Sequence, residues 1–275
     1  MAGPENDSFV RFLYGTALGR CLLKGIQGLH LDRLAVWYLR SRLSRPYMVR
    51  FAQRNGIPIS SEELRQFPTY RDFFLRERAP LPMDMDPNHL ISPCDGWFSA
   101  YQVQPDSSFA IKGSRYGVGD LLGDQPLAKK YEGGLALIFR LCASDYHHYC
   151  YIDDGHQGPN HYMEGRLHSV QPIACEHYPI FILNRRSWCL LDTVHFGPVV
   201  QTEIGALVVG GIVNAPEGPM GRGQEKGHFD LSGSTIVLLI EPGRIELLPE
   251  LAAQVNTGQE TRVTEGQWVA TATQT

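Results

Sequence analysis

A segment of small residues leads directly into an apolar run near the C-terminal end of the sequence. Residues 226–235 read Lys-Gly-His-Phe-Asp-Leu-Ser-Gly-Ser-Thr, and the apolar residues 236–240 follow at once. The ordinary interpretation is a hairpin turn. Glycine also allows backbone conformations that other residues avoid, so the peptide between Gly233 and Ser234 could be held under strain. The hydroxyl of Ser234 could then attack the carbonyl group that precedes it.

Two adjacent histidines beside an aspartate follow an apolar run in the middle of the chain. Asp145 is followed by Tyr146, His147 and His148. A histidine titrates nearest to neutral pH, so one of the two could act as a general base. Adjacent side chains in a strand point to opposite faces, so at most one of them serves a given site. The ten histidines include no H-E-x-x-H motif, and no closely spaced cysteine pair accompanies them, so we expect no metal site.

A third segment of possible chemical interest is the sequence Ser-Pro-Cys-Asp-Gly at residues 92–96. Taken alone, it predicts a tight turn and nothing more. Its carboxylate, Asp95, becomes a candidate for catalysis only in combination with the two segments above.

The elements that must position these residues fall into two regions. Apolar residues at helical spacing predict helices over residues 9–55, and two serines before two glutamates predict a further helix start at residues 60–63. A proline-rich linker at residues 79–87 marks a boundary. We therefore expect a helical, basic region over residues 1–80 and a β-rich domain over residues 81–275, an α+β fold. The predicted strands are residues 97–103, 136–141, 188–193, 199–213, 235–240 and 244–248.

The charge distribution indicates a partner for the helical region. Residues 1–80 contain 13 Lys and Arg against 7 Asp and Glu, a net charge of +6, whereas the whole chain carries −4. Basic, amphipathic helices of this kind are typical of segments that bind an anionic membrane surface. The alternative is a helical layer that packs on the rest of the protein and keeps its arginines in water.

Other features bound the class of protein. No run of about 18 apolar residues occurs, so we expect no transmembrane helix, and the first nine residues lack the pattern of a secretory signal. The six cysteines form no C-x-x-C pair, which is typical of reduced cysteines in a cytosolic protein, most of them in the core.

In their order along the chain and in combination, the three segments resemble the phosphatidylserine decarboxylase family. That family has an S-P-x-D-G turn, a D-Y-H segment, and a G-S-T cleavage site preceded by K-G-x-F. These motifs correspond here to Ser92–Gly96, Asp145–His147 and Gly233–Thr235 with Lys226–Phe229. Weaker matches extend the resemblance to about 200 residues, and they lie at residues 73–77, 111–114, 184–186 and 208–212.

The resemblance implies a proenzyme that cleaves itself and makes its own cofactor. Ser234 would attack the carbonyl of Gly233, and elimination from the resulting ester would leave a pyruvoyl group on the downstream fragment. By the same resemblance His147 is the base and Asp95 orients it, as in the relay of serine hydrolases. The pyruvoyl carbonyl would form a Schiff base with the substrate amine and accept the electrons released with CO₂. His147, or more weakly His168 or His148, would supply the final proton.

The sequence departs from the family pattern at two positions. Many members have a second histidine, three residues after the first, where this chain has Cys150, and Ser232 stands where leucine or glycine is usual. The first departure bears on the proton donor for decarboxylation more than on self-cleavage.

The resemblance further implies a phospholipid substrate, large and small subunits from one chain, and a homodimer. It places the protein peripherally on the cytoplasmic face of the cell membrane and implies no nucleic-acid partner. Two alternatives stay open: a pyruvoyl-dependent decarboxylase of a soluble aromatic amino acid, and a β-rich binding module that never cleaves.

Overall fold

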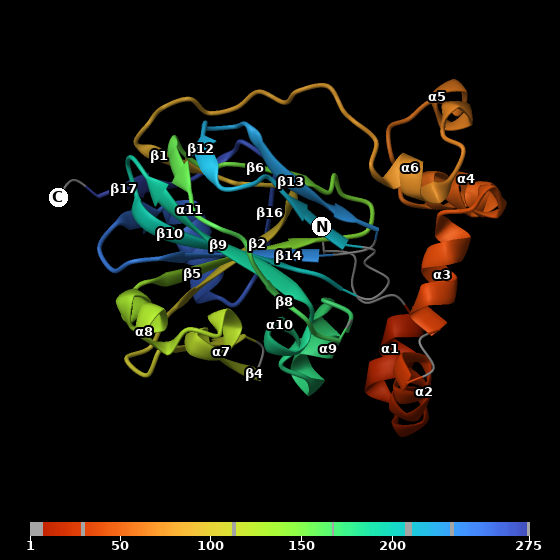
Figure 1. Ribbon diagram of the computed structural model, residues 1–275, viewed down its shortest axis with the longest axis horizontal. Coiled ribbons are helices and arrows are strands. Elements are labelled where there is room, and N and C mark those ends of the chain that lie inside the picture. Colours follow the sequence, from red (N-terminus) through yellow and green to blue (C-terminus); the bar gives the residue numbers. More distant parts are fainter. Residues whose placement is uncertain are drawn as a thin grey trace.

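The structure is a computed structural model that describes residues 8–28, 31–111, 114–166, 168–206, 211–231 and 234–273. Helices gather on the N-terminal side, and a body rich in β-strands occupies the rest of the molecule (Figure 1). The predicted α+β class is confirmed.

The N-terminal helices form a column along one side of the body (Figure 1). The Ser60 hydroxyl accepts a hydrogen bond from the amide of Glu63, and the Glu63 carboxylate accepts one from the amide of Ser60, so the predicted helix start is confirmed. Thr69 caps the next helix by accepting from the amide of Asp72. The elements are α1 (Ser8–Gly15), α2 (Ala17–Gly28), α3 (Leu31–Leu39), the 3₁₀ turn η1 (Arg42–Ser44), α4 (Arg45–Arg54), α5 (Ser61–Gln66) and α6 (Tyr70–Phe74).

Part of the helical layer packs against the body. Leu13 and Tyr14 of α1 lie in the same apolar core as Ala174 of the body, and Phe73 of α6 shares a core with Leu231. The connector from α6 to the first strand, residues 75–88, contains no helix or strand and runs over the body (Figure 1).

Several large apolar side chains of the helical layer remain exposed. They include Leu18, Leu22, Leu34, Trp37, Leu43 and Tyr47. Within the described part of the chain, no helix is long and apolar enough to cross a membrane.

The described strands form four antiparallel sheets. The largest has the order β12-β7-β9-β10-β14-β5-β2-β16, with β8 paired to β9; smaller sheets have the orders β1-β17-β15, β11-β13-β6 and β3-β4. The strands are β1 (His89–Ile91), β2 (Gly96–Gln102), β3 (Ser108–Ile111), β4 (Ser114–Gly117), β5 (Leu135–Leu141), β6 (His148–Cys150), β7 (Gly155–Gln157), β8 (His161–Met163), β9 (Arg186–Thr193), β10 (Gly197–Ile204), β11 (Gly211–Asn214), β12 (Gly218–Met220), β13 (Glu225–Asp230), β14 (Ser234–Ile240), β15 (Ile245–Leu247), β16 (Thr261–Val263) and β17 (Trp268–Ala272).

Strand β14 lies in the interior of the largest sheet, between β10 and β5. All seven of its residues are buried, and it contains the strand predicted over residues 235–240. The single strand predicted over residues 199–213 is wrong. Its first part is β10, which ends at Ile204, and its last part belongs to β11, which lies in a different sheet.

Short helices interrupt the β-rich body at places where the sequence analysis identified none. They are α7 (Val118–Leu122), α8 (Gln125–Ala128), the 3₁₀ turn η2 (Lys129–Tyr131), α9 (Pro172–His177), α10 (Ile180–Leu183) and α11 (Pro249–Asn256). Each has at most eight residues, which is too short for a helical apolar period to stand out.

A fully buried ion pair ties β13 to the largest sheet. The Nζ atom of Lys226 lies 2.8 Å from Oε1 of Glu203 on β10 and donates to Oδ1 of Asn214 at 3.0 Å. Asn214 in turn donates to Glu203 at 2.9 Å. At the next position only glycine fits, because a Cβ atom on Gly227 would lie 2.1 Å from the carbonyl oxygen of Val213. Residues 226 and 227 therefore fix the strand that leads toward Ser234.

Candidate active site

The turn at residues 92–96 presents Asp95 between β1 and β2. The Ser92 hydroxyl donates to the carbonyl of Cys94 at 2.7 Å, and the amide of Cys150 donates to the carbonyl of Pro93 at 2.8 Å. A Cβ atom on Gly96 would lie 2.9 Å from the carbonyl oxygen of Arg140, so the turn needs glycine there. The backbone of this motif therefore fixes the Asp95 carboxylate against neighbouring segments.

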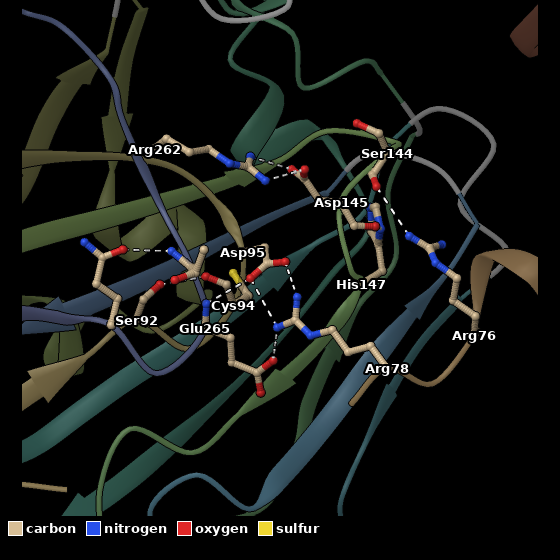
Figure 2. Close-up of polar contacts among 12 residues, drawn as sticks. Arg76, Arg78, Ser92, Cys94, Asp95, Ser144, Asp145, His147, Arg262 and Glu265 are labelled. Atoms are coloured by element: carbon tan, nitrogen blue, oxygen red, sulfur yellow. Dashed lines mark hydrogen bonds and ion pairs between the residues drawn. The ribbon is translucent and has the colours of Figure 1, made fainter. Parts of the chain in front are cut away.

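An arginine from the connector binds Asp95. Both terminal nitrogens of Arg78 donate to the Asp95 carboxylate, and one of them also donates to Oε2 of Glu265 at 2.7 Å (Figure 2). The amide of Glu265 donates to Oδ1 of Asp95 at 2.9 Å. One arginine thus bridges two mostly buried carboxylates that lie 170 positions apart in the sequence.

Two buried thiols lie in the same cluster. Burial raises the pKa of Cys94 and of Cys150 well above the usual range, and the Glu265 carboxylate raises the pKa of Cys150 further. Burial also raises the pKa of Glu265, although Arg78 opposes that shift. Both thiols therefore stay protonated at neutral pH, so Cys150 offers no thiolate nucleophile here.

His147 is fully buried and is held by a backbone group. Its Nδ1 atom lies 3.0 Å from the carbonyl oxygen of Asp145, which can only accept, so Nδ1 carries the proton in the neutral ring. Its Nε2 atom has no hydrogen-bond partner within the described residues. Burial lowers the pKa of His147 to about 4, with Asp145 opposing the shift. At neutral pH the ring therefore offers an unprotonated Nε2, the form that a general base requires.

Packing and an ion pair fix the loop that carries His147. The Phe74 ring lies 4.2 Å from the His147 ring, centroid to centroid, and Phe229 lies edge-on to it at 6.4 Å. Both terminal nitrogens of Arg262 donate to the Asp145 carboxylate, at 3.0 and 2.6 Å (Figure 2). The backbone carbonyl that orients His147 is held in place by the side chain of the same aspartate.

The predicted contact between Asp95 and His147 does not appear among the contacts of the described residues. Asp95 is bound by Arg78 and the amide of Glu265, and the Nδ1 atom of His147 faces Asp145. The two residues lie in one region of the molecule, but each has its own set of partners (Figure 2).

The two weaker histidine candidates lie in different surroundings. His148 faces Glu225, with 3.0 Å between Nδ1 and Oε1. His168 lies 3.3 Å from the Tyr14 hydroxyl and stacks on Tyr178, and burial lowers its pKa to about 4. Only His147 therefore packs against both Phe74 and Phe229, the last of which lies on the strand that leads to Ser234.

Ser234 is the first residue of β14, it is fully buried, and it pairs with Leu141 of β5. Gly233, the predicted cleavage position, lies outside the described residues. Three residues before Ser234, the buried Leu231 has a φ of 68°, a left-handed conformation that costs a leucine about 1–2 kcal/mol. Backbone strain therefore lies next to the predicted cleavage position.

The strand before the predicted cleavage position is anchored on both sides. The amide of Phe229 donates to the carbonyl of His147 at 3.0 Å. The buried Asp230 accepts from Arg40 at 2.7 Å and from Arg71 at 2.8 Å, and both arginines belong to the helical layer. The helical layer thus holds the chain four residues before Ser234.

Sequence reasoning missed several residues that position the candidates. Phe74 and Arg78 were not singled out, although Phe74 falls in one of the matched segments, and Glu265 and Arg262 lie in C-terminal segments without any distinguishing motif. A buried carboxylate needs a cation, and that requirement was the one signal that could have prompted a search for an arginine near Asp95.

Comparison with known proteins gives a consistent result. The family model described as phosphatidylserine decarboxylase matches residues 70–269. A protein of Clostridium acetobutylicum named phosphatidylserine decarboxylase proenzyme 2 is 36% identical over 261 residues, covering 94% of this chain and 90% of that protein. Proteins named phosphatidylserine decarboxylase proenzyme from Desulfitobacterium hafniense and Clostridium beijerinckii are 34% and 33% identical, covering 95% and 96% of this chain and 91% and 92% of theirs.

Proposed function

Because this chain belongs to the phosphatidylserine decarboxylase family and is a carboxy-lyase, we propose that it converts phosphatidylserine to phosphatidylethanolamine with a pyruvoyl group made from its own Ser234. The proenzyme names of its relatives support the self-cleaving part of this proposal. The observation that carries it for this chain is the buried Ser234 at the start of β14, three residues after the strained Leu231.

Self-cleavage begins when the Ser234 hydroxyl attacks the carbonyl carbon of Gly233 and the acyl group moves from nitrogen to oxygen. His147 takes the hydroxyl proton on Nε2. This nitrogen is unprotonated because Nδ1 carries the ring proton and donates it to the Asp145 carbonyl. Loss of the α-proton of residue 234 then breaks the ester, with residues 1–233 leaving as a carboxylate. Hydrolysis of the remaining dehydroalanine releases ammonia and leaves the pyruvoyl group at the start of the fragment 234–275.

In this proposal Asp95 acts through Arg78. Since Arg78 occupies the Asp95 carboxylate, we assign Asp95 to fixing the turn at residues 92–96 and the connector beside it. Orientation of His147 falls to the Asp145 carbonyl. The Asp95–His147 relay expected from the resemblance is replaced by two separate supports.

Two buried polar atoms, on Thr235 and His147, suit the proposed group. Thr235 Oγ1 and His147 Nε2 are buried polar atoms without a partner among the described residues. Buried polar atoms in native structures are normally bonded, so these two are available to a group formed at residue 234. When present, the pyruvoyl group supplies an electron-accepting carbonyl for the loss of CO₂. His147 then holds the proton that the substrate carbon receives.

The test is the intact mass of the purified chain under denaturing conditions. We expect two fragments that meet between Gly233 and Ser234, with the smaller one blocked at its N-terminus by the mass of a pyruvoyl group. Ser234→Ala should give one full-length mass and no decarboxylation. Ser232→Ala is the matched control, because it removes a hydroxyl two positions away and should still cleave. An active, uncleaved Ser234→Ala protein would overturn the proposal.

We assign the substrate to the lipid class, presented at an anionic membrane surface on the cytoplasmic side. The exposed apolar side chains of α2 and α3 and the net charge of +6 over residues 1–80 support this. Release of CO₂ from phosphatidylserine vesicles, but not from free tyrosine, phenylalanine or tryptophan, is the expected result. The opposite preference would favour the soluble amino-acid decarboxylase, and a full-length, inactive wild-type chain would favour a binding module.

A further inference from the structure

A second group of ionisable side chains lies on the β6–β13 pair, and the decarboxylation proposed above does not use it. His148, Glu225 and His228 each offer one possible ligand atom, and these atoms all lie within 4.8 Å of one another. We propose that these three residues form a binding site for a divalent transition-metal ion of the Zn²⁺ type. The sequence analysis expected no metal site.

The backbone brings the three side chains to one face. His148 and His228 are directly opposed in the register of β6 and β13, so their side chains lie next to each other. Glu225, three residues before His228, would point to the other face of a regular strand. The register shifts between Glu225 and Gly227, however, so that Glu225 opposes Cys150, two residues from His148. This irregularity turns the carboxylate onto the face of the two imidazoles.

The distances suit a small metal ion. The Glu225 Oε1 atom lies 3.0 Å from Nδ1 of His148 and 3.6 Å from Nδ1 of His228. Ligands bound tetrahedrally to zinc at about 2.0–2.1 Å lie about 3.3 Å from one another. Small adjustments of the side chains are therefore enough to place an ion between them.

The surroundings favour metal binding over a simple surface ion pair. His148 is buried, so little water competes for its ring. Tyr146 stacks on the ring, with 4.7 Å between centroids, and restricts its rotation. The Glu225 side chain is 56% exposed, which leaves an entry path and an open coordination position for water.

The ligand set selects the kind of ion. Two imidazoles and one carboxylate suit Zn²⁺ and its neighbours Co²⁺ and Ni²⁺, whereas Mg²⁺ and Ca²⁺ prefer sets made of oxygen alone. The site also contacts the candidate active site, because the Tyr146 ring that stacks on His148 carries the Arg78 guanidinium 4.2 Å from its centroid. An ion at His148 would therefore rigidify a neighbour of the arginine that binds Asp95.

The experiment uses the full chain after dialysis against a chelator. Titration with Co²⁺ should give the visible absorption of an ion of low coordination number, one ion per chain, and Zn²⁺ should abolish it, while Mg²⁺ and Ca²⁺ should not. Glu225→Gln keeps the shape of the side chain and removes its charge, and His228→Ala removes one imidazole. Each should weaken Zn²⁺ binding at least ~10-fold. His156→Ala, an exposed histidine on β7, is the control and should bind like the wild type.

Thermal unfolding provides the second measurement. Zn²⁺ should raise the Tm of the wild type and of His156→Ala, since an ion that binds only the folded state stabilises it. It should leave the Tm of Glu225→Gln and His228→Ala nearly unchanged. Wild-type protein that binds no Co²⁺ or Zn²⁺, or variants that bind both as tightly as the wild type, would overturn the proposal and reduce the cluster to an ion pair.

Discussion

The imidazole ring of His147 lies against the phenyl ring of Phe74, with 4.2 Å between the two ring centroids. Phe74 is the last residue of α6, so the helical layer contributes a wall to the candidate active site. This contact makes the N-terminal region part of the environment that keeps His147 buried and neutral.

We expect Phe74→Ala to slow self-cleavage and to lower the free energy of unfolding by about 3–5 kcal/mol, because it leaves a cavity beside His147. Phe67→Ala is the control: Phe67 packs on Phe73 in the same apolar core, and among the described residues no ring contact joins it to His147. Cleavage rates of freshly made protein and urea unfolding would be measured for both variants. Equal slowing of cleavage in the two would show that Phe74 does not position His147.

Arg78→Lys should slow self-cleavage. It should also lower the free energy of unfolding by about 1–3 kcal/mol. Lysine keeps the charge but cannot bind Asp95 and Glu265 with a planar pair of donors. The control is Arg185→Lys at the exposed pair with Glu164, which should change stability by less than about 0.5 kcal/mol. Urea unfolding would measure the stability of both variants. Similar decreases in the free energy of unfolding would show that Arg78 contributes no more than an exposed ion pair.

Stability should fall as the pH is lowered from about 6.5 to about 4. Burial lowers the pKa of His147 and of His168 to about 4, whereas both titrate near 6.5 in an unfolded chain. In this window the unfolded state binds protons that the folded state does not, so each histidine destabilises the fold by up to about 3 kcal/mol. Above pH 6.5 neither histidine makes the free energy of unfolding depend on pH.

His168→Phe tests this pH dependence without removing the aromatic contact with Tyr178. Urea unfolding at a series of pH values should give a shallower loss of stability for the variant than for the wild type. Identical slopes would mean that His168 is protonated as easily in the folded protein as in the unfolded one.

Lys226→Met should destabilise the protein by about 3–5 kcal/mol, because it leaves the Glu203 carboxylate buried without its cation. The double variant Lys226→Met, Glu203→Gln should recover part of that loss, since the amide is neutral and can still bond Asn214. Thermal or urea unfolding measures both. A double variant no more stable than the single one would mean that packing, rather than charge, explains the effect of residue 226.

Replacing Leu34 and Trp37 together by serine should weaken binding to phosphatidylserine vesicles by about tenfold or more, because both side chains are more than 60% exposed on α3 and available to a membrane interface. The unfolding midpoint should stay unchanged. Val194→Ser, at an equally exposed apolar residue of the body, is the control. Vesicle co-sedimentation would measure all three proteins, and unchanged binding of the double variant would assign these side chains no part in docking.

The sequence predicts the elements whose pattern is local. The apolar run at residues 236–240 is a buried strand, and the two serines before Glu62 and Glu63 begin a helix, because both signals depend only on neighbouring residues. The division of residues 199–213 between two sheets was not predictable, since the change of sheet depends on tertiary pairing and not on the local sequence.

The sequence motifs identify the candidate residues of the site. They do not identify the side chains that hold those residues in place. Asp95, His147 and Ser234 stand in recognisable segments. Arg78 and Glu265 reach Asp95 only because the connector and a C-terminal loop fold against the same turn. The residues next to them in the sequence give no signal of this contact. Glu225 joins the two histidines only because of an irregularity in strand pairing, which a periodic pattern does not reveal.

If the chain is cut before Ser234 as proposed, β14 stays in the sheet between β10 and β5 but belongs to a separate fragment. Unfolding would then also be a dissociation into two chains. An intact chain unfolds and refolds as one molecule, so its midpoint does not depend on protein concentration. If the chain is cut before Ser234, as proposed, the same transition would release two chains, and residues 234–275 would have to find their partner again to restore the sheets that β14, β16 and β17 complete. The midpoint of the processed protein would then rise with concentration, and dilution would slow the reassociation of the two fragments.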